Sequence, residues 1–275
     1  MKYIELKRSL ENGEVFSAYL FEGEESFFAK KGCALLEEKF LTEPSLNLAN
    51  FEGSNLDMTA LTASLVAYPF MSEKRVTKIT EFYPKASEVK ELKKILPDLP
   101  DTALLIIVNK EKSDALSKIE QIQVVSCVKE ESNLVAKWIK AECNRNKVLI
   151  DLENALKVAE YCLLDMTRVV LETKKLCDYV GENEEITQEI IDLLVYKDSE
   201  YKVFKMTEHI AQKKFDLALS VIQEMLSKGE PPQKILVSIY NYFRKLLHVA
   251  ISTKTNIELA NVLGSKDFVV KLRLT

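Results

Sequence analysis

The chain has 275 residues, of which 47% are hydrophobic and 29% charged, a composition typical of a globular protein long enough for two domains. Its formal net charge of −4 argues against tight, autonomous nucleic-acid binding, which needs a concentrated basic surface. The five cysteines include no CxxC pair, and with two histidines the chain has no zinc-ligand spacing, so no metal and no cofactor are expected.

The N-terminus, MKYIELKRSLENGEVF, lacks the apolar segment of a signal peptide. No apolar run in the chain reaches the roughly 18 residues of a membrane span. We therefore expect a cytoplasmic protein without membrane contact, whose thiols are reduced and mostly buried.

Short apolar strands alternate with amphipathic helices over the first 128 residues. The apolar run ALLIIV at 103–108 is typical of a central parallel strand that is buried on both faces. Ser26 is expected to cap the first helix of this region and Asp57 the second. The alternation predicts a doubly wound α/β domain, a parallel sheet covered on both faces. Its strands are expected at 17–21, 48–51, 75–80, 103–108 and 121–126, and its helices at 27–41, after Asp57, and at 88–96.

After about Lys129 the strand patterns stop, and the rest of the chain is predicted to be helical. Asp151 and Asp165 are expected to cap two of these helices, and the polar segment 196–200 is a candidate domain boundary. The last segment, IELANVLGSKDFVVKLRLT, begins a helical pattern that stops while still apolar, so we expect an incomplete final domain or a partner for it. The expected helices are 133–146, 152–161, 166–179, a short one capped by Thr187 that runs to Val195, 201–212, 215–228 and 233–252.

The stretch 61–79, LTASLVAYPFMSEKRVTKI, runs a helix into an apolar turn. Pro69 biases Tyr68 away from the helical region, so the helix should end near Ala67. Phe70 and Met71 would then lie on a connection, and connections usually run over the surface. Two interpretations stay open: the pair forms a partner-binding site, or it packs under the helix as core.

The loop around Gly23 occupies the place of a phosphate-binding loop but does not read GxxxxGK[ST]. Glu24 and Glu25 crowd it with negative charge, and Ser26 is not preceded by the lysine that would meet a phosphate. We therefore expect no nucleotide there. No Ser or Cys nucleophile is near either histidine in sequence, so no catalytic residue is predicted. The lysines at 85–94 are interpreted as a solvated helix face, with weak DNA contact as the alternative.

Several segments, taken in order, resemble the delta subunit of the bacterial DNA polymerase III clamp loader. They are YLFEGEE, NLANF, PFMSEKR, VLETKKL, EEITQEII, the long run from VFKMTEHIAQ to YFRKLLHVA, and ELANVLGSKDFVVKL. The resemblance implies an α/β plus all-α protein. Its parts would be an AAA+-type (RecA-like) domain at 1–129 with a degenerate nucleotide site, a helical lid domain at 130–198, and a helical collar domain at 199–275 that is incomplete at its end.

The resemblance also implies a function. Such a subunit binds the sliding clamp (beta) and opens it for loading onto primed DNA during chromosomal replication, without hydrolysing ATP itself. It has no active site and is an accessory subunit of a DNA-directed DNA polymerase. Its collar joins the gamma/tau and delta prime subunits, and it touches DNA weakly, within the complex. The alternatives are a P-loop-like ATPase with an altered loop and a helical adaptor unrelated to replication.

The resemblance places the clamp contacts on the apolar turn. The family's pair of large apolar residues falls on Phe70 and Met71, where Met stands in place of a Leu or Phe. Leu65, Tyr68 and Pro69 lie beside this pair in the sequence and are expected to belong to the site. Lys74 and Arg75 are expected to supply rim charges that tune encounter more than affinity. The degenerate phosphate loop comprises Gly23, Glu24, Glu25 and Ser26.

Overall fold

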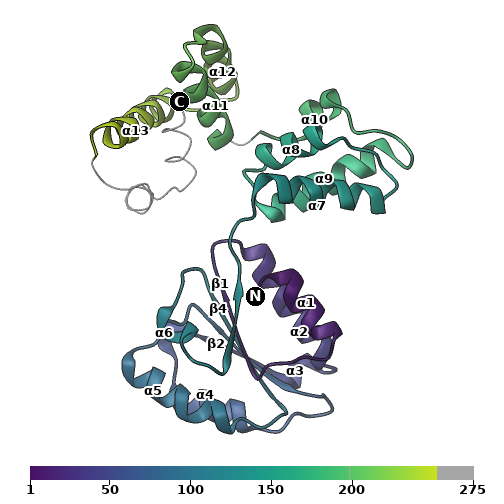
Figure 1. Cartoon of the computed structure of the whole chain (residues 1–275), viewed down its shortest axis with the longest axis vertical. Coiled ribbons are helices and arrows are strands. Elements are labelled where there is room, and N and C mark those ends of the chain that lie inside the picture. Colours follow the sequence, from purple (N-terminus) through teal and green to yellow (C-terminus); the bar gives the residue numbers. More distant parts are fainter. Residues whose placement is uncertain (198, 253–275) are drawn as a thin grey trace.

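A parallel sheet of five strands organises the first half of the chain. The computed structural model describes residues 1–197 and 199–252. The strands lie in the order β2-β3-β4-β1-β5, and every neighbouring pair is parallel (Figure 1). This confirms the predicted sheet and all of its strands. Their bounds are Ala18–Glu22 for β1, Leu48–Glu52 for β2, Arg75–Thr80 for β3, Ala103–Asn109 for β4 and Ile122–Ser126 for β5.

The middle strands are buried on both faces of the sheet. In β1, Tyr19 and Phe21 join the core under α1 and α2, whereas Leu20 joins the core under α4, α5 and α6. The two groups of helices lie on opposite sides of the sheet (Figure 1). The doubly covered α/β arrangement is therefore confirmed. The helices are α1 (Tyr3–Glu11), α2 (Ser26–Phe40), α4 (Met58–Val66), α5 (Ala86–Ile95) and α6 (Asp114–Ser117).

Some short elements of this half were not predicted. Helix α1 buries Leu6 and Leu10, which are four residues apart, and the chain before it runs beside β5, where the Ser126 N–H donates to the Met1 carbonyl at 2.8 Å. Two buried leucines are too few to establish a helical period in a charged segment. The others are the one-turn helix α3 (Pro44–Asn47) and the 3-10 turns η1 (Gly53–Asn55) and η2 (Leu96–Asp98).

The second half of the described chain is helical. Helices α7 to α10 share one apolar core, and the aspartate caps predicted before α8 and α9 are confirmed, because Asp151 accepts from Asn154 N and Asp165 from Arg168 N. Helices α11 to α13 pack around a smaller core of Met206, Met225 and Ile235. The bounds are α7 (Ser132–Arg145), α8 (Leu152–Tyr161), α9 (Met166–Val180), α10 (Gln188–Leu194), α11 (Ser199–Ala211), α12 (Phe215–Ser227) and α13 (Pro232–Ile251).

These separate cores are compatible with the domain boundaries at 129 and 198 that the resemblance implies. The boundaries themselves stay a proposal. The expected final helical pattern, at 253–275, lies outside the described residues. In the described part of the chain, no helix combines the length and the apolar character needed to cross a membrane.

All five cysteines are buried and free in the structure, which confirms that they were correctly expected to be buried. Burial raises the pKa of Cys33 to about 11 and that of Cys162 to about 12. Because the thiolate is the reactive form, these groups are poor nucleophiles at neutral pH.

A polar cluster around Asp192 joins α10 to the segment that leads into α11. The Asp192 carboxylate accepts from Tyr161 Oη at 3.0 Å and from Gln188 Nε2 at 2.6 Å, and Lys197 Nζ lies 2.8 Å from Oδ1. Tyr161 also contacts Tyr201 of α11, with ring centroids 4.9 Å apart. Burial alone would raise the pKa of Asp192, but the hydrogen bonds from Lys197, Gln188 and Tyr161 outweigh it and lower the pKa.

The substitution Asp192→Asn is expected to lower the free energy of unfolding of the α7 to α10 unit at pH 7 by at most about 1 kcal/mol, because this carboxylate is 42% exposed and partly screened. A group with a lowered folded pKa stabilises above its unfolded pKa, and the contribution is lost as the pH falls through the folded pKa. The difference between the two proteins should therefore begin to shrink below about pH 4, near the unfolded pKa, and disappear once the pH is below the lowered folded pKa.

Urea unfolding at pH 7 and pH 3, followed by the fluorescence of Trp138, measures this difference, because Trp138 packs against the same core. The control is Asp178→Asn, which removes an exposed carboxylate 3.8 Å from Lys174. An equal loss of stability at both pH values would contradict the expectation.

Candidate functional site

The apolar turn that follows α4 is exposed. Helix α4 ends at Val66 with Ala67 as its C-cap, as predicted from Pro69. Tyr68 is 84% exposed, Phe70 58% and Met71 75%. The alternative that Phe70 and Met71 pack as core is therefore wrong. We call the side chains of Tyr68, Phe70 and Met71 the apolar turn.

The buried side chain of Asn47, the last residue of α3, holds the apolar turn from behind. Its Oδ1 accepts from Phe70 N at 2.6 Å, and its Nδ2 donates to the Phe70 carbonyl at 2.7 Å. The same Nδ2 lies 2.9 Å from Ser72 Oγ. One amide group thus satisfies both backbone polar groups of Phe70, as buried polar groups require.

The other side of the turn is tied to the start of α3. Ser72 Oγ accepts from Thr42 N at 3.1 Å and from Glu43 N at 3.2 Å. Between these attachments Met71 has a φ of 53°, a left-handed conformation that is costly for a residue with a side chain. The turn therefore has a defined, pre-formed shape before any partner binds.

Two further apolar side chains flank this turn. Leu46 precedes Asn47 and is 52% exposed, and Val66 at the end of α4 is 53% exposed. Leu46 was not predicted as a site residue because α3 was not predicted. A proline at the first position of a possible helix, Pro44, was the available signal.

Leu65 was wrongly assigned to the site. It is 1% exposed and belongs to the core between α4 and the sheet, as does Leu61 one helical turn earlier. Residues four apart share a helix face, so Leu61 and Leu65 face the sheet, whereas the next residue, Val66, faces outward. Pro69 is half-buried.

Lys74 and Arg75, the expected rim charges, are half-buried and held within the chain. The Lys74 ammonium donates to the Asp101 carbonyl and lies 5.4 Å from the centroid of the Phe40 ring. Arg75 Nη1 donates to the Leu46 carbonyl at 3.0 Å. Glu73 is the exposed charge beside the turn.

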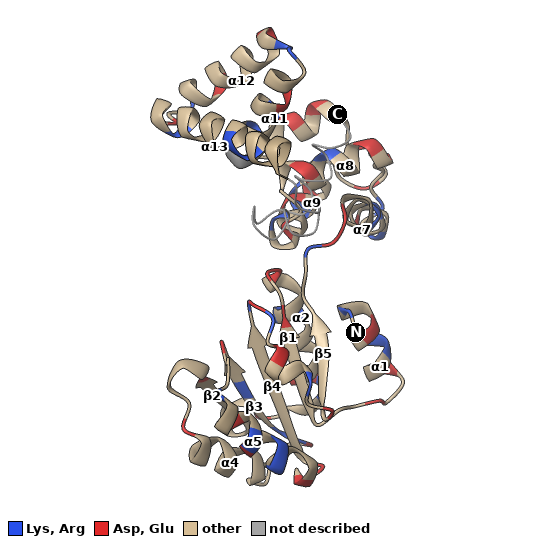
Figure 2. Cartoon of the chain, turned by 60° about the vertical axis from the view of Figure 1, so that its left-hand side comes forward, with Lys and Arg blue, Asp and Glu red and all other residues tan. Residues whose placement is uncertain are grey.

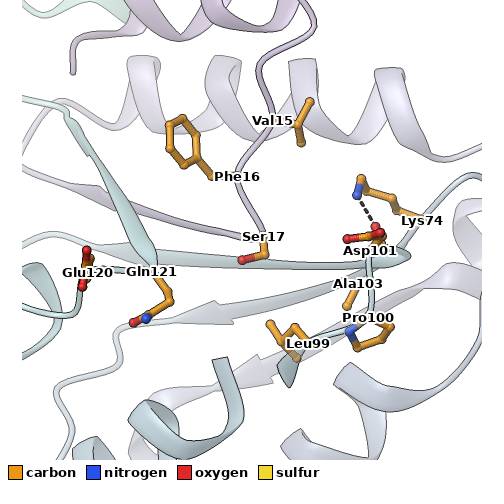
Figure 3. A pocket seen from close by; sticks show the side chains of 10 residues that line it. All are labelled: Val15, Phe16, Ser17, Lys74, Leu99, Pro100, Asp101, Ala103, Glu120 and Gln121. Carbon is orange, nitrogen blue, oxygen red and sulfur yellow. Dashed lines mark hydrogen bonds between the residues drawn. The ribbon is translucent and has the colours of Figure 1, made fainter. Parts of the chain in front are cut away.

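A pocket lies next to Lys74, at the edge of the sheet where β4 and β5 begin. Its lining includes Phe16 and the acidic residues Asp101 and Glu120, and Figure 3 shows the Lys74 side chain directed at Asp101. Because this lysine is already bonded to a carbonyl, the pocket presents acidic groups without an available cation. We assign no binding or catalytic role to this pocket.

The degenerate phosphate loop is tightly packed at the opposite edge of the sheet. Gly23 has a φ of 138°, and a Cβ there would lie 2.2 Å from the Cys127 carbonyl oxygen, so only glycine fits. Glu25 N donates to that carbonyl at 2.8 Å. Glu24 is exposed.

Glu25, not Ser26, caps α2. The expected cap Ser26 is the first residue of the helix, and the Glu25 carboxylate accepts from Phe27 N at 3.1 Å. Glu25 is 3% exposed, and its second oxygen accepts from Met166 N of α9 at 3.1 Å. A carboxylate thus occupies the helix terminus where a phosphate would be bound.

Two family models match separate parts of the chain. A family model described as DNA polymerase III, delta subunit matches residues 19–136, and one described as DNA polymerase III delta subunit, C-terminal domain matches residues 200–275. The DNA polymerase III subunit delta of Bacillus subtilis (strain 168) is 24% identical over 262 residues, which are 87% of this chain and 74% of that protein.

A solved structure shows the same fold. The Bacillus subtilis DNA clamp loader delta protein matches with a TM-score of 0.72 and 22% identity, over 98% of this chain and 86% of that one. The Thermotoga maritima RuvB Holliday junction branch migration motor matches less well, with a TM-score of 0.41 and 14% identity, over 95% of this chain and 79% of that one.

Replacing Asn47 with Ala is expected to lower the free energy of unfolding by about 1–3 kcal/mol, because it leaves the N–H and the carbonyl of Phe70 without their partner. Hydrogen exchange at the Phe70 amide should also become faster. Denaturant unfolding and amide exchange measure the two effects. The control, Asn50→Ala, removes the same group from an exposed position on β2. An unchanged Phe70 exchange rate in Asn47→Ala would show that the amide does not hold the turn.

Proposed function

The chain belongs to the DNA polymerase III delta subunit family, and we propose that it binds the sliding clamp through the apolar turn and opens it for loading onto primed DNA. As a clamp-loader delta subunit of AAA+-like fold, it acts in DNA replication. The observation that carries the clamp-binding proposal is the exposure of Tyr68, Phe70 and Met71 on a turn held by Asn47.

The physical properties of the apolar turn suit a binding site that inserts into a pocket. Interfaces draw most of their energy from a few large side chains, and losing one such residue costs on the order of 2 kcal/mol or more. Because Asn47 already orders Phe70, little conformational entropy is lost on binding. Leu46 and Val66 extend the apolar surface around the turn and are proposed as additional contacts.

Opening a ring requires more than affinity. A ligand shifts a two-state equilibrium only by its difference in affinity for the two states, so the subunit must bind the open clamp more tightly than the closed one. A turn with a fixed shape supports such discrimination, since a flexible one could follow the clamp surface in both states.

We infer that the chain does not hydrolyse ATP and that it contains no active site. The support is the packing of Gly23 against Cys127 and the position of the Glu25 carboxylate at the α2 terminus, which would repel a phosphate. The competing interpretation is a P-loop-like ATPase with an altered loop. A helical adaptor unrelated to replication is disfavoured by the family match across both halves of the chain.

The third helical unit is proposed to join the gamma/tau and delta prime subunits as a collar. Helix α13 exposes apolar side chains at intervals of three or four residues, which places them along one side of the helix: Leu236, Tyr240, Phe243, Leu247 and Ile251. The small core of this unit leaves such surface uncovered in the described chain. Contact with neighbouring subunits would bury it.

Contact with primed DNA is proposed to be weak and to occur within the complex. The lysines of α5 give one local group of positive charge on a chain whose net charge is −4 (Figure 2). Such a patch can assist binding but cannot by itself neutralise many phosphates. A cytoplasmic location, where replication takes place in bacteria, completes the proposal.

The double substitution Phe70→Ala with Met71→Ala is expected to weaken clamp binding by about a hundredfold or more, since it removes two central apolar contacts. Both side chains are exposed, so the unfolding transition should stay where it is in the native protein. Surface plasmon resonance with immobilised clamp, together with a clamp-unloading assay, measures the change.

The matched control is Leu171→Ala, which truncates an apolar side chain that is 63% exposed on α9, away from the turn. It should bind the clamp as the native chain does. Native affinity and unloading rate in the double variant would show that the site is elsewhere.

The isolated chain is expected to bind no ATP at millimolar concentration and to show no phosphate release. Equilibrium dialysis with labelled ATP and a phosphate-release assay test this, with an ATP-hydrolysing loader subunit as the positive control. A measurable turnover in the isolated chain would contradict the inference and support the altered-loop ATPase instead.

A further inference from the structure

The buried carboxylate of Glu25 connects two parts of the chain that are far apart in sequence. One oxygen accepts from Phe27 N in the first turn of α2, and the other accepts from Met166 N at the start of α9, 141 residues away. Glu25 is 3% exposed and Met166 also 3%. The α/β domain and the α7 to α10 unit thus share one buried acceptor group.

Both donors lie at helix amino termini, where backbone N–H groups have no partner within the helix. The aligned peptide dipoles give each terminus a partial positive charge, which favours a negative group nearby. Asp165 satisfies another donor of the same α9 terminus, Arg168 N, at 3.0 Å, but it leaves Met166 N to Glu25. A carboxylate between two such termini is stabilised from both sides.

The turn that presents Met166 has an unusual backbone. Leu163 and Leu164, which precede the Asp165 cap, have φ values of 54° and 58°. Left-handed conformations at residues with side chains are costly, so they persist where surrounding contacts fix them. Leu164 packs against the core of the α7 to α10 unit, and the Leu163 carbonyl accepts from Lys129 Nζ at 3.4 Å.

Apolar contacts accompany this hydrogen bond at the junction. The aromatic side chains of Phe27 and Phe28, at the start of α2, pack against the core of the α7 to α10 unit. Apolar contacts of this kind resist separation but allow sliding, because they have no directional preference. A hydrogen bond to a fixed backbone N–H is directional and would select one orientation.

We propose that Glu25 is a built-in anion that fixes the α7 to α10 unit on the α/β domain, in the place where a bound phosphate would otherwise lie. The two parts then move as one body without any nucleotide. The proposal does not depend on clamp binding, and clamp is absent from its test.

The test compares Glu25→Gln, Glu25→Ala and the control Glu24→Ala in the full chain. Glutamine keeps the size of the side chain but has one acceptor oxygen, so it can satisfy one of the two N–H groups. Glu24 is the exposed neighbour of Glu25, so Glu24→Ala removes the same negative charge without removing the hydrogen bond to Met166 N. Spin labels on Lys90→Cys in α5 and Lys174→Cys in α9 report the distance between the two parts, since both positions are exposed and the natural thiols are buried.

We expect a single narrow distance distribution in the native chain and in Glu24→Ala, and a broad one in both Glu25 variants. Hydrogen exchange should become about tenfold faster or more at Met166 in Glu25→Ala, while amides of the central strands β1 and β4 keep their protection. Retained strand protection separates loss of the junction from a failure to fold.

Two outcomes would overturn the proposal. The first is a distribution as narrow as that of the native chain in both Glu25 variants, with unchanged exchange at Met166. The second is a broad distribution in Glu25→Ala that Glu25→Gln does not share, which would assign the effect to packing and not to the second acceptor and the charge.

Discussion

Burial of the central strands on both faces of the parallel sheet is the constraint on which the other features depend. It forces every connection to one of two edges. The degenerate phosphate loop follows β1 and lies at the carboxyl edge, beside α9, whereas the apolar turn precedes β3 and lies at the amino edge. The rigid sheet therefore separates the proposed clamp contact from the helical units, which lie beyond the opposite edge (Figure 1).

Two buried polar side chains determine the local geometry at these edges. Asn47 satisfies the backbone of Phe70, and Glu25 satisfies the termini of α2 and α9. Unpaired polar groups are costly to bury, so each residue specifies one arrangement of its neighbours more strongly than apolar contacts alone would. Such specificity at both edges of the sheet limits the orientations that the apolar turn and the α7 to α10 unit can adopt.

The charged residues near the apolar turn show how tertiary contacts can change a role inferred from sequence. Lys74 and Arg75 follow Phe70 and Met71 closely, as rim charges would. Their cationic groups donate to the carbonyls of Asp101 and Leu46, which ties the start of β3 to its surroundings. They are better described as residues that position the turn than as charges open to a partner.

The sequence alone determined the parallel α/β domain, its five strands, the helical remainder, the end of α4 near Ala67 and the family, because these follow from local periodicity, caps, Pro69 and ordered motifs. Only the tertiary structure decided that Leu65 is core, that Leu46 flanks the turn, that Glu25 caps α2, and that Asn47 and Glu25 bond to residues 23 and 141 positions away. The physical reason is range: periodicity reports which face of an element is buried, whereas a hydrogen-bond partner across the fold is set by how the elements pack.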